Sequence, residues 1–171
     1  MGQYKYPLGR SDAPTDPFTI AERSDIMRRV KSNNTSPELR LRRALWNQGL
    51  RYRLNVRSLP GKPDLVFRKA MVVVFVDGEF WHGKKLSPER LSAMKPYWQK
   101  KIRRNVERDI EVNRTLFDMG WTIVRVGERT VNKWTDSTTQ MIIRILRGDE
   151  PGRLPEGATF IPQDQGVMSD G

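Results

Sequence analysis

Between residues 36 and 146 the spacing of apolar positions changes several times, and each change predicts a different element. Residues 71–76 form a continuous apolar run, which is typical of a strand buried on both faces. Residues 65–67 precede this run, with Arg68-Lys69-Ala70 between them, so the two segments are expected to pair as a hairpin. Residues 121–126 predict a further strand, and the alternation over 52–56 predicts a half-buried one.

Apolar positions at helical spacing alternate with these strands. Residues 21–31 predict a short basic helix. Ser36, Pro37 and Glu38 predict the start of a second helix, with serine as N-cap and the acid facing the positive end of the helix dipole. Residues 96–119 predict a long helix that Gly120 ends, and residues 137–146 predict a closing helix.

The order of these elements predicts an α/β fold with a mixed central β-sheet flanked by helices. Residues 1–18 contain glycine, proline and aspartate without periodicity and are expected to be a flexible arm. Residues 148–171 are rich in glycine and proline and are expected to be a flexible tail. The domain between them is predicted to span residues 19–147.

Composition narrows the function classes. The 171 residues include no cysteine, which excludes disulfides and thiolate metal sites. The formal net charge of +11 favours a polyanionic partner, and nucleic acid is the commonest. No apolar stretch is long enough to span a bilayer, so we expect no membrane contact and a cytoplasmic, nucleoid-associated protein.

Two acids and the single histidine lie beside the predicted hairpin. Asp64 follows Pro63 at the start of a strand, where a carboxylate can bind a hard cation such as Mg²⁺. Asp77 ends the partner strand, so its carboxylate, or the backbone carbonyl of Val76, can share that cation with Asp64. Pro-Asp is also a common turn pair and Asp-Gly is the favoured hairpin-turn pair, which is the simpler explanation for both acids.

His82 follows the turn after the second strand, and an imidazole has a suitable pKa to take a proton from water at neutral pH. A lone histidine is more often a surface or packing residue, so the two nearby acids carry the argument. Glu38 has an ordinary explanation as an acid in the first turn of a helix.

Aromatic and basic residues follow the predicted site. Phe80 and Trp81 are adjacent on the chain, and Trp98 lies near the start of the long helix. Rings like these can stack on bases or insert into a duplex, or simply pack in the core. The predicted helix also places basic and amide side chains near one face, where they can hold phosphates or be a solvated surface: Lys101, Arg104, Asn105 and Arg108.

Several segments occur together in a familiar order. They are Arg23-Ser24-x-x-Met27-Arg28, Ser36-Pro37-Glu38, Leu59-Pro60-Gly61-Lys62-Pro63-Asp64, Val74-Phe75-Val76-Asp77-Gly78-x-Phe80-Trp81-His82-Gly83, Trp98-x-x-Lys101-Ile102-x-x-Asn105-x-x-Arg108-Asp109 and Gly120-Trp121-x-Ile123-x-Arg125-Val126. Over residues 20–127 the chain thereby resembles the very-short-patch repair mismatch endonuclease family. The resemblance implies a restriction-endonuclease-like core and Mg²⁺-dependent hydrolysis of one DNA strand, 5′ of the thymine in a T:G mismatch. The partner is then double-stranded DNA with a mismatch, bound by a monomer.

The resemblance also implies residue roles. Asp64 matches the metal-binding aspartate, Val76 the residue whose carbonyl contacts the metal, and His82 the general base. Glu38 matches the acid that supports the water or the base. Aromatic residues that match the duplex wedge are Phe80, Trp81 and Trp98, and Arg28 belongs to the basic segment that grips the opposite, minor-groove side.

Two departures from the family pattern affect these expectations. Glu79 stands at a cysteine-like position of a structural zinc site, and the chain contains no cysteine, so we expect no zinc. Asp77 stands where some members have histidine, which can strengthen metal binding or alter the substrate. Two alternatives therefore stay open: a restriction- or defence-type nuclease of the same fold with another DNA target, and a DNA-binding module without catalysis.

Overall fold

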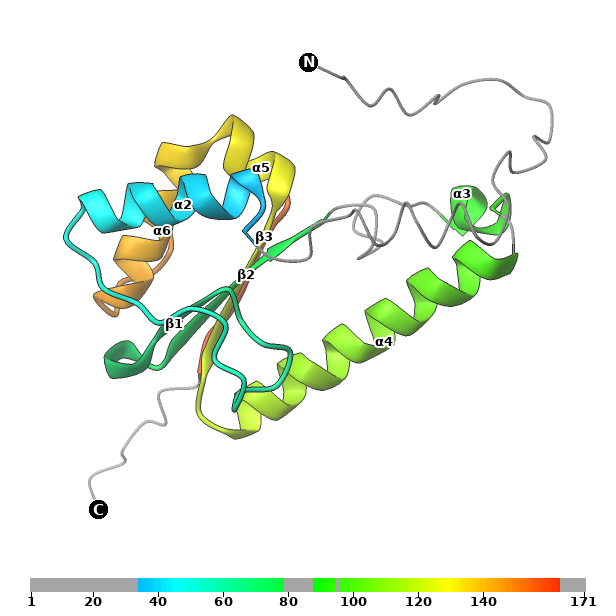
Figure 1. The fold of residues 1–171 in the computed structure, drawn as a ribbon, viewed down its shortest axis with the longest axis horizontal. Coiled ribbons are helices and arrows are strands. Elements are labelled where there is room, and N and C mark those ends of the chain that lie inside the picture. Colours follow the sequence, from blue (N-terminus) through cyan, green and yellow to red (C-terminus); the bar gives the residue numbers. More distant parts are fainter. Residues whose placement is uncertain (1–33, 79–87, 95, 164–171) are drawn as a thin grey trace. The chain divides into compact units, whose positions relative to one another are not determined.

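The computed structural model describes residues 34–78, 88–94 and 96–163, and within them four strands form one mixed sheet in the order β1-β2-β3-β4 (Figure 1). Strands β1 (Leu65–Phe67) and β2 (Val72–Asp77) pair antiparallel, with a 3₁₀ turn η1 (Arg68–Ala70) between them. The predicted hairpin is therefore confirmed. Its register sets Leu65 opposite Val74 and Phe67 opposite Val72.

Strand β3 (Thr122–Gly127) pairs parallel to β2, and the long helix α4 (Pro96–Asp118) lies between them in the sequence. Parallel neighbours need such a crossover connection because a tight turn cannot join them. The prediction of a helix over 96–119 followed by a strand over 121–126 is confirmed to within one residue. Asp77 lies opposite Gly127, so β2 and β3 end together.

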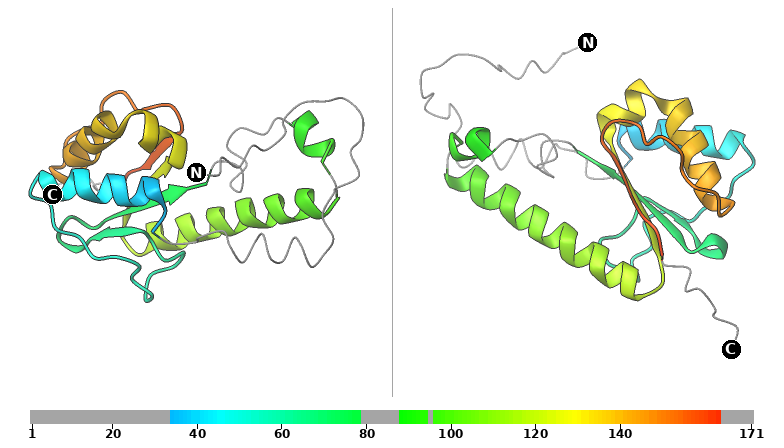
Figure 2. Two further views of the ribbon diagram at one scale, coloured as in Figure 1. Left: turned by 45° about the horizontal axis from the view of Figure 1, so that its top comes forward. Right: turned by 180° about the vertical axis from the view of Figure 1, so that it is seen from behind.

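Helices cover both faces of the sheet (Figure 2). One face packs against α2 (Ser36–Asn47), α5 (Glu128–Lys133) and α6 (Thr135–Leu146). The C-terminal half of α4 packs on the other face through Leu116. The strands supply both cores by alternation, since Val72, Val74 and Val76 belong to the first and Val73 and Phe75 to the second. The prediction of an α/β fold with helices on a mixed sheet is confirmed.

Two elements differ from the sequence-based prediction. Residues 52–56 form no strand, and only Arg53 makes an isolated bridge to Val66. Asn55 has a positive φ of 45°, which interrupts extended geometry there. Strand β4 (Ala158–Ile161) lies inside the predicted tail and pairs antiparallel with β3, so the tail prediction is wrong for these residues.

The helices also show smaller differences. Helix α2 begins one residue earlier than predicted, because Thr35 rather than Ser36 is the N-cap. The short helices α3 (Pro88–Ser92) and α5 were not expected. The predicted arm 1–18, the predicted helix 21–31, and residues Arg28, Glu79, Phe80, Trp81 and His82 lie outside the described residues. In the part of the chain that the structure describes, no helix is both long and apolar enough to cross a membrane.

Candidate active site and nucleic-acid interface

Asp64 lies at the mouth of the hairpin, directly before β1. The chain reaches it through a tight turn in which Gly61 and Lys62 both adopt positive φ, at 71° and 53°. The side chain then turns toward β2, where its Oδ2 accepts a hydrogen bond of 2.7 Å from the backbone N–H of Val76. The carboxylate of Asp64 is thereby held at the end of β2, beside Val76 and Asp77.

The backbone carbonyl of Val76 points to the same edge. In an extended strand the N–H and C=O of one residue face the same side, which is why paired residues exchange two bonds in an antiparallel ladder. Continuing the hairpin register sets Pro63 opposite Val76, and proline has no N–H to offer the Val76 carbonyl. We infer that the Asp64 carboxylate and the Val76 carbonyl are neighbouring oxygens at this edge.

Glu38 enters the site from the first turn of α2. Its side chain is 3% exposed, and both of its oxygens accept hydrogen bonds. Oε2 accepts from the backbone N–H of Asn34 and from Nη2 of Arg42, both at 2.9 Å, and Oε1 accepts from Thr35 Oγ1 at 3.1 Å. Thr35 and Glu38 have the spacing of a helix capping box, so the acid also fixes the start of α2.

The charges around Asp64 change its affinity for protons. Burial is the main cause that raises the pKa of Asp64 to about 6, and the charges of Glu38 and Asp77 add to this rise. The hydrogen bond from the Val76 N–H and the charge of Arg42 oppose it. Asp64 is therefore an acid whose negative charge is only partly compensated by the described protein groups. A bound divalent cation would supply the missing positive charge.

Asp77 is held by Arg125 of β3. Nε of Arg125 donates to Oδ2 of Asp77 at 2.8 Å and Nη2 donates to Oδ1 at 2.9 Å, which is the bidentate geometry of a strong ion pair. Both side chains are about 5% exposed. Burial alone would lower the pKa of Arg125, but the bonds and charges of Asp77 and Asp109 outweigh it and raise this pKa. The carboxylate of Asp77 is thus occupied by a cation of the protein, and its role as a metal ligand stays a prediction.

The described residues suit a hard cation that keeps most of its water. Among them, no group of three or more His, Asp or Glu side chains is arranged to hold a metal ion. Mg²⁺ does not need such a group, because it binds through one or two protein oxygens and retains several waters. The Asp64 carboxylate and the Val76 carbonyl provide that number. Burial is the main cause of the raised pKa of Asp64, and a bound cation would favour its charged form.

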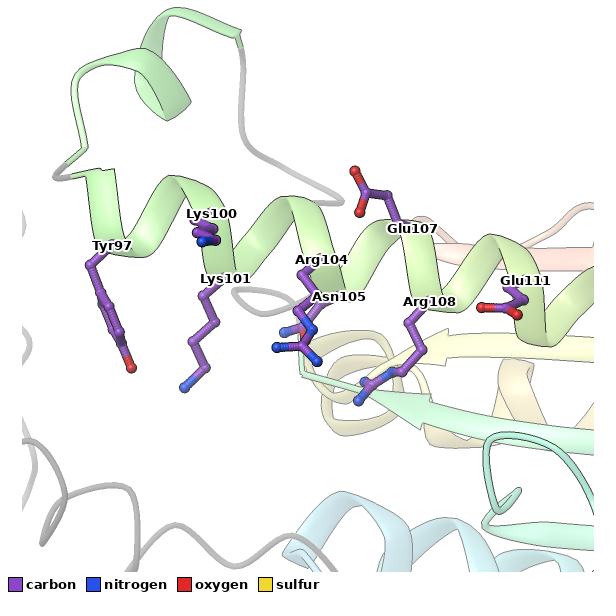
Figure 3. A pocket seen from close by; sticks show the side chains of 8 residues that line it. All are labelled: Tyr97, Lys100, Lys101, Arg104, Asn105, Glu107, Arg108 and Glu111. Atoms are coloured by element: carbon purple, nitrogen blue, oxygen red, sulfur yellow. The ribbon is translucent and has the colours of Figure 1, made fainter.

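A basic concavity of about 870 Å³ lies along α4 (Figure 3). Its described lining consists of Tyr97, Lys100, Lys101, Arg104, Asn105, Glu107, Arg108 and Glu111. The side chains of Tyr97, Lys101 and Arg108 extend from the same side of the helix, whereas Glu107 extends the other way. The prediction that Lys101, Arg104, Asn105 and Arg108 share one face is confirmed, while their binding of DNA stays a prediction.

Trp98 lies at the N-terminal end of α4. It is half-buried, its ring meets that of Tyr97 edge to face with centroids 5.0 Å apart, and the Lys101 ammonium lies 5.7 Å from its centroid. The rings of Tyr97 and Trp98 therefore lie beside the basic face of α4.

Comparison with known proteins decides the family. The sequence profile of the family described as DNA mismatch endonuclease Vsr matches residues 15–87. A type II nicking enzyme of Neisseria meningitidis serogroup C is 41% identical over 134 residues, which is 77% of this chain and 90% of that protein. The DNA mismatch endonuclease Vsr of Escherichia coli K12 is 38% identical over 148 residues, or 86% of this chain and 93% of that protein. The chain belongs to the Vsr family.

A third relative supports this assignment. A type II nicking enzyme of Haemophilus parainfluenzae is 41% identical over 121 residues, which cover 69% of this chain and 86% of that protein. The resemblance inferred from the sequence segments is thereby confirmed, and this Vsr-family chain is an endonuclease of DNA. The described part of the site brings together Glu38, Asp64 and the end of β2, as expected.

Three residues of this Vsr-family site were not recognised from the sequence. Arg42 binds Glu38, and its buried Nε has no hydrogen-bond partner among the described residues. Arg125 binds Asp77, and Pro63, opposite Val76 when the register is continued, has no N–H to donate to the Val76 carbonyl. Arg125 had a visible indication in the sequence, because it interrupts the apolar run Ile123–Val126 and a charge in a buried strand requires a partner.

Proposed function

We propose that this chain is a Mg²⁺-dependent endonuclease that nicks one DNA strand, 5′ of the thymine in a T:G mismatch. The observation that carries the proposal is the position of Asp64 beside Val76 at the end of β2, with Glu38 close enough to raise the pKa of Asp64. Vsr family membership supplies the reaction class, because the E. coli relative is named a DNA mismatch endonuclease. Other relatives are named type II nicking enzymes.

Asp64 and the Val76 carbonyl would hold the metal. When bound there, Mg²⁺ would stabilise the negative charge that develops on the attacked phosphate and on the leaving oxygen. We leave the Asp77 carboxylate out of this ligand set, since both of its oxygens already accept from Arg125. Its charge still acts on Asp64 from the same end of the sheet.

The remaining roles follow the family resemblance. His82 would take the proton from the attacking water, and Glu38 would support the water or the base from its fixed position on α2. Phe80, Trp81 and Trp98 would insert beside the mismatch. A wobble pair is easier to unstack than a matched pair, so ring insertion favours it through deformation energy.

Two parts of the chain would grip the duplex. The concavity on α4 presents Lys101, Arg104 and Arg108 to phosphates, which positions the DNA without reading its sequence. Arg28 and its basic neighbours would hold the opposite side. We propose that a monomer does this in the cytoplasm, on nucleoid DNA.

A nicking assay tests the proposal. Two end-labelled duplexes that differ only in a T:G or a C:G pair are incubated with the full chain in Mg²⁺ or in EDTA. We expect one cut in the T strand of the mismatched duplex, only with Mg²⁺. Asp64→Asn should abolish cleavage and leave duplex binding within about threefold, because the exchange removes the metal-binding charge but little contact area. Arg129→Ala, which removes an exposed side chain of α5, is the control that keeps activity.

The outcomes separate the candidates. Equal cleavage of both duplexes would contradict the mismatch specificity and would favour a nuclease with another DNA target. No cleavage of any duplex by folded protein in Mg²⁺ would contradict the catalytic proposal. Cleavage that persists in EDTA would contradict the metal.

A further inference from the structure

Arg125 joins three elements of the fold at the end of the sheet. It belongs to β3, and its guanidinium bonds both oxygens of Asp77 on β2. Its Nη2 also donates to Asp109 Oδ1 and its Nη1 to Asn113 Oδ1, each at 3.0 Å. Asp109 and Asn113 both lie on α4. A single buried side chain therefore ties α4 to the ends of β2 and β3.

The guanidinium has little freedom to move within this cluster. It is 5% exposed and lies 4.7 Å from the centroid of the Phe75 ring, which covers it from the β2 side. The guanidinium of Arg125 is planar and makes contacts on three of its edges, so it fixes both the distance and the angle between its partners. Bare stability does not require this arrangement, because well-packed apolar residues can replace a buried ion-pair cluster.

The partners of Arg125 stand next to functional groups. Asp77 directly follows Val76, whose backbone N–H bonds the carboxylate of Asp64. Asp109 directly follows Arg108, which extends into the basic concavity of α4 (Figure 3). The distance from the phosphate-holding face to the metal-binding edge is thus set through Arg125 and its four bonds.

We propose that Arg125 is a positioning residue that sets the register between the DNA phosphates held by α4 and the phosphodiester presented to Asp64. This inference rests on the proposed function and deepens it. Bound DNA spans both places, so the rigidity of the cluster selects which phosphodiester along the strand reaches the reacting groups. Loosening the cluster should spread cleavage to neighbouring phosphodiesters, whereas a purely structural residue would change only the amount of folded enzyme.

The test compares cut positions at nucleotide resolution on the end-labelled mismatch duplex. Arg125→Lys keeps the positive charge but cannot form the forked contacts to Asp77, Asp109 and Asn113 together. We expect its kcat to fall at least about tenfold, with duplex affinity within about threefold, and at least about a tenth of its cuts to move to adjacent phosphodiesters. Arg129→Lys on α5 is the matched control and should cut as the parent does.

A second variant covers the case in which Arg125→Lys does not fold. Asn113→Ala removes only the bond to Nη1 and should give the same displaced cuts in a smaller share. Asn132→Ala, which truncates an exposed side chain of α5, is its control. A single unchanged cut position in folded Asn113→Ala or Arg125→Lys would overturn the inference. Cleavage by the parent chain is read in the same gel, so loss of the proposed function itself would appear there as no cut at all.

Discussion

The backbone N–H of Val76 donates a 2.7 Å hydrogen bond to the carboxylate of Asp64, across the open end of the hairpin. In the continued register this N–H would face the carbonyl of Pro63, but it bonds the side chain of Asp64 instead. A side-chain acceptor therefore takes the place of a backbone acceptor at the open end of the ladder. The same hydrogen bond holds the candidate metal ligand, Asp64, at the end of β2.

Asp64→Asn should stabilise the metal-free protein at neutral pH. The folded pKa of Asp64 is raised to about 6 from an ordinary value of 3.8, so the folded state binds the proton more tightly than the unfolded state does. Stability from this group is complete below pH 3.8 and is lost as the pH rises to 6. The loss is on the order of 3 kcal/mol. Asparagine cannot ionise, so urea unfolding in EDTA should show the variant gaining on the parent between pH 4 and pH 7.

The comparison with metal gives the opposite sign. Mg²⁺ should raise the melting temperature of the parent at pH 8 and leave that of Asp64→Asn unchanged, since a ligand that binds only the folded state stabilises it by mass action. A parent that is equally stable from pH 4 to pH 7 in EDTA would contradict the electrostatic description of Asp64.

Glu38→Ala should destabilise the fold strongly. The change removes the acceptor of three hydrogen bonds and leaves the buried Arg42 without its ion-pair partner. Breaking a buried pair in this way costs about 3 to 5 kcal/mol. Chemical denaturation measures the loss, and Arg40→Ala on the exposed side of α2 should change stability by less than about 0.5 kcal/mol.

The double variant Glu38→Leu/Arg42→Met separates stability from catalysis. Replacing both charges with apolar groups should recover most of the stability lost in Glu38→Ala. If Glu38 also supports the water or the base, this folded double variant should still cleave at least about a hundredfold more slowly than the parent. Full cleavage by it would reduce Glu38 to its capping role.

Arg104→Ala and Arg108→Ala should each weaken the dependence of DNA binding on salt. A side chain that neutralises one phosphate contributes about 0.9 to the slope of log K against log salt concentration. Fluorescence anisotropy between 50 and 300 mM salt should therefore give slopes shallower by about 0.9 for each variant. Arg129→Ala loses the same formal charge from α5 and should keep the parent slope.

Gly61→Ala should cost more than Gly49→Ala, although both glycines have positive φ, of 71° and 80°. A Cβ at position 61 would lie 2.6 Å from Cγ1 of Val112, whereas one at position 49 meets nothing within 4 Å. Both variants incur left-handed backbone strain of about 1 kcal/mol. The further loss in Gly61→Ala, about 1 to 3 kcal/mol from overpacking, should appear in thermal or urea unfolding. Equal losses would contradict the close packing of this turn on α4.

The sequence predicted the hairpin, the long helix and the strand after it, because each has a long or uninterrupted pattern. It did not predict β4, since Ala158–Ile161 is short, lies among glycine and proline, and becomes a strand only by pairing with β3. It wrongly predicted a strand at 52–56, where alternation was present but Asn55 leaves the extended region.

Single acids could be found from the sequence, but their partners could not. Asp64, Asp77 and Glu38 stand at turns and helix starts that mark them individually. The bond from Asp77 to Arg125 joins residues 48 positions apart, and no local pattern encodes it. Such pairings depend on the parallel register of β2 and β3, which only the folded sheet defines.

The crossover through α4 also has a consequence for how this enzyme is made. Residues 78–121 separate β2 from β3 in the sequence, so the pairing of these strands closes a long loop. Contacts that close long loops form slowly. The ion pair between Asp77 and Arg125 can form only once these two strands meet. During synthesis the chain would therefore contain Asp64 and Asp77 before Arg125 can hold Asp77 in place. A nuclease whose active site is completed in this order is inactive while it is still folding.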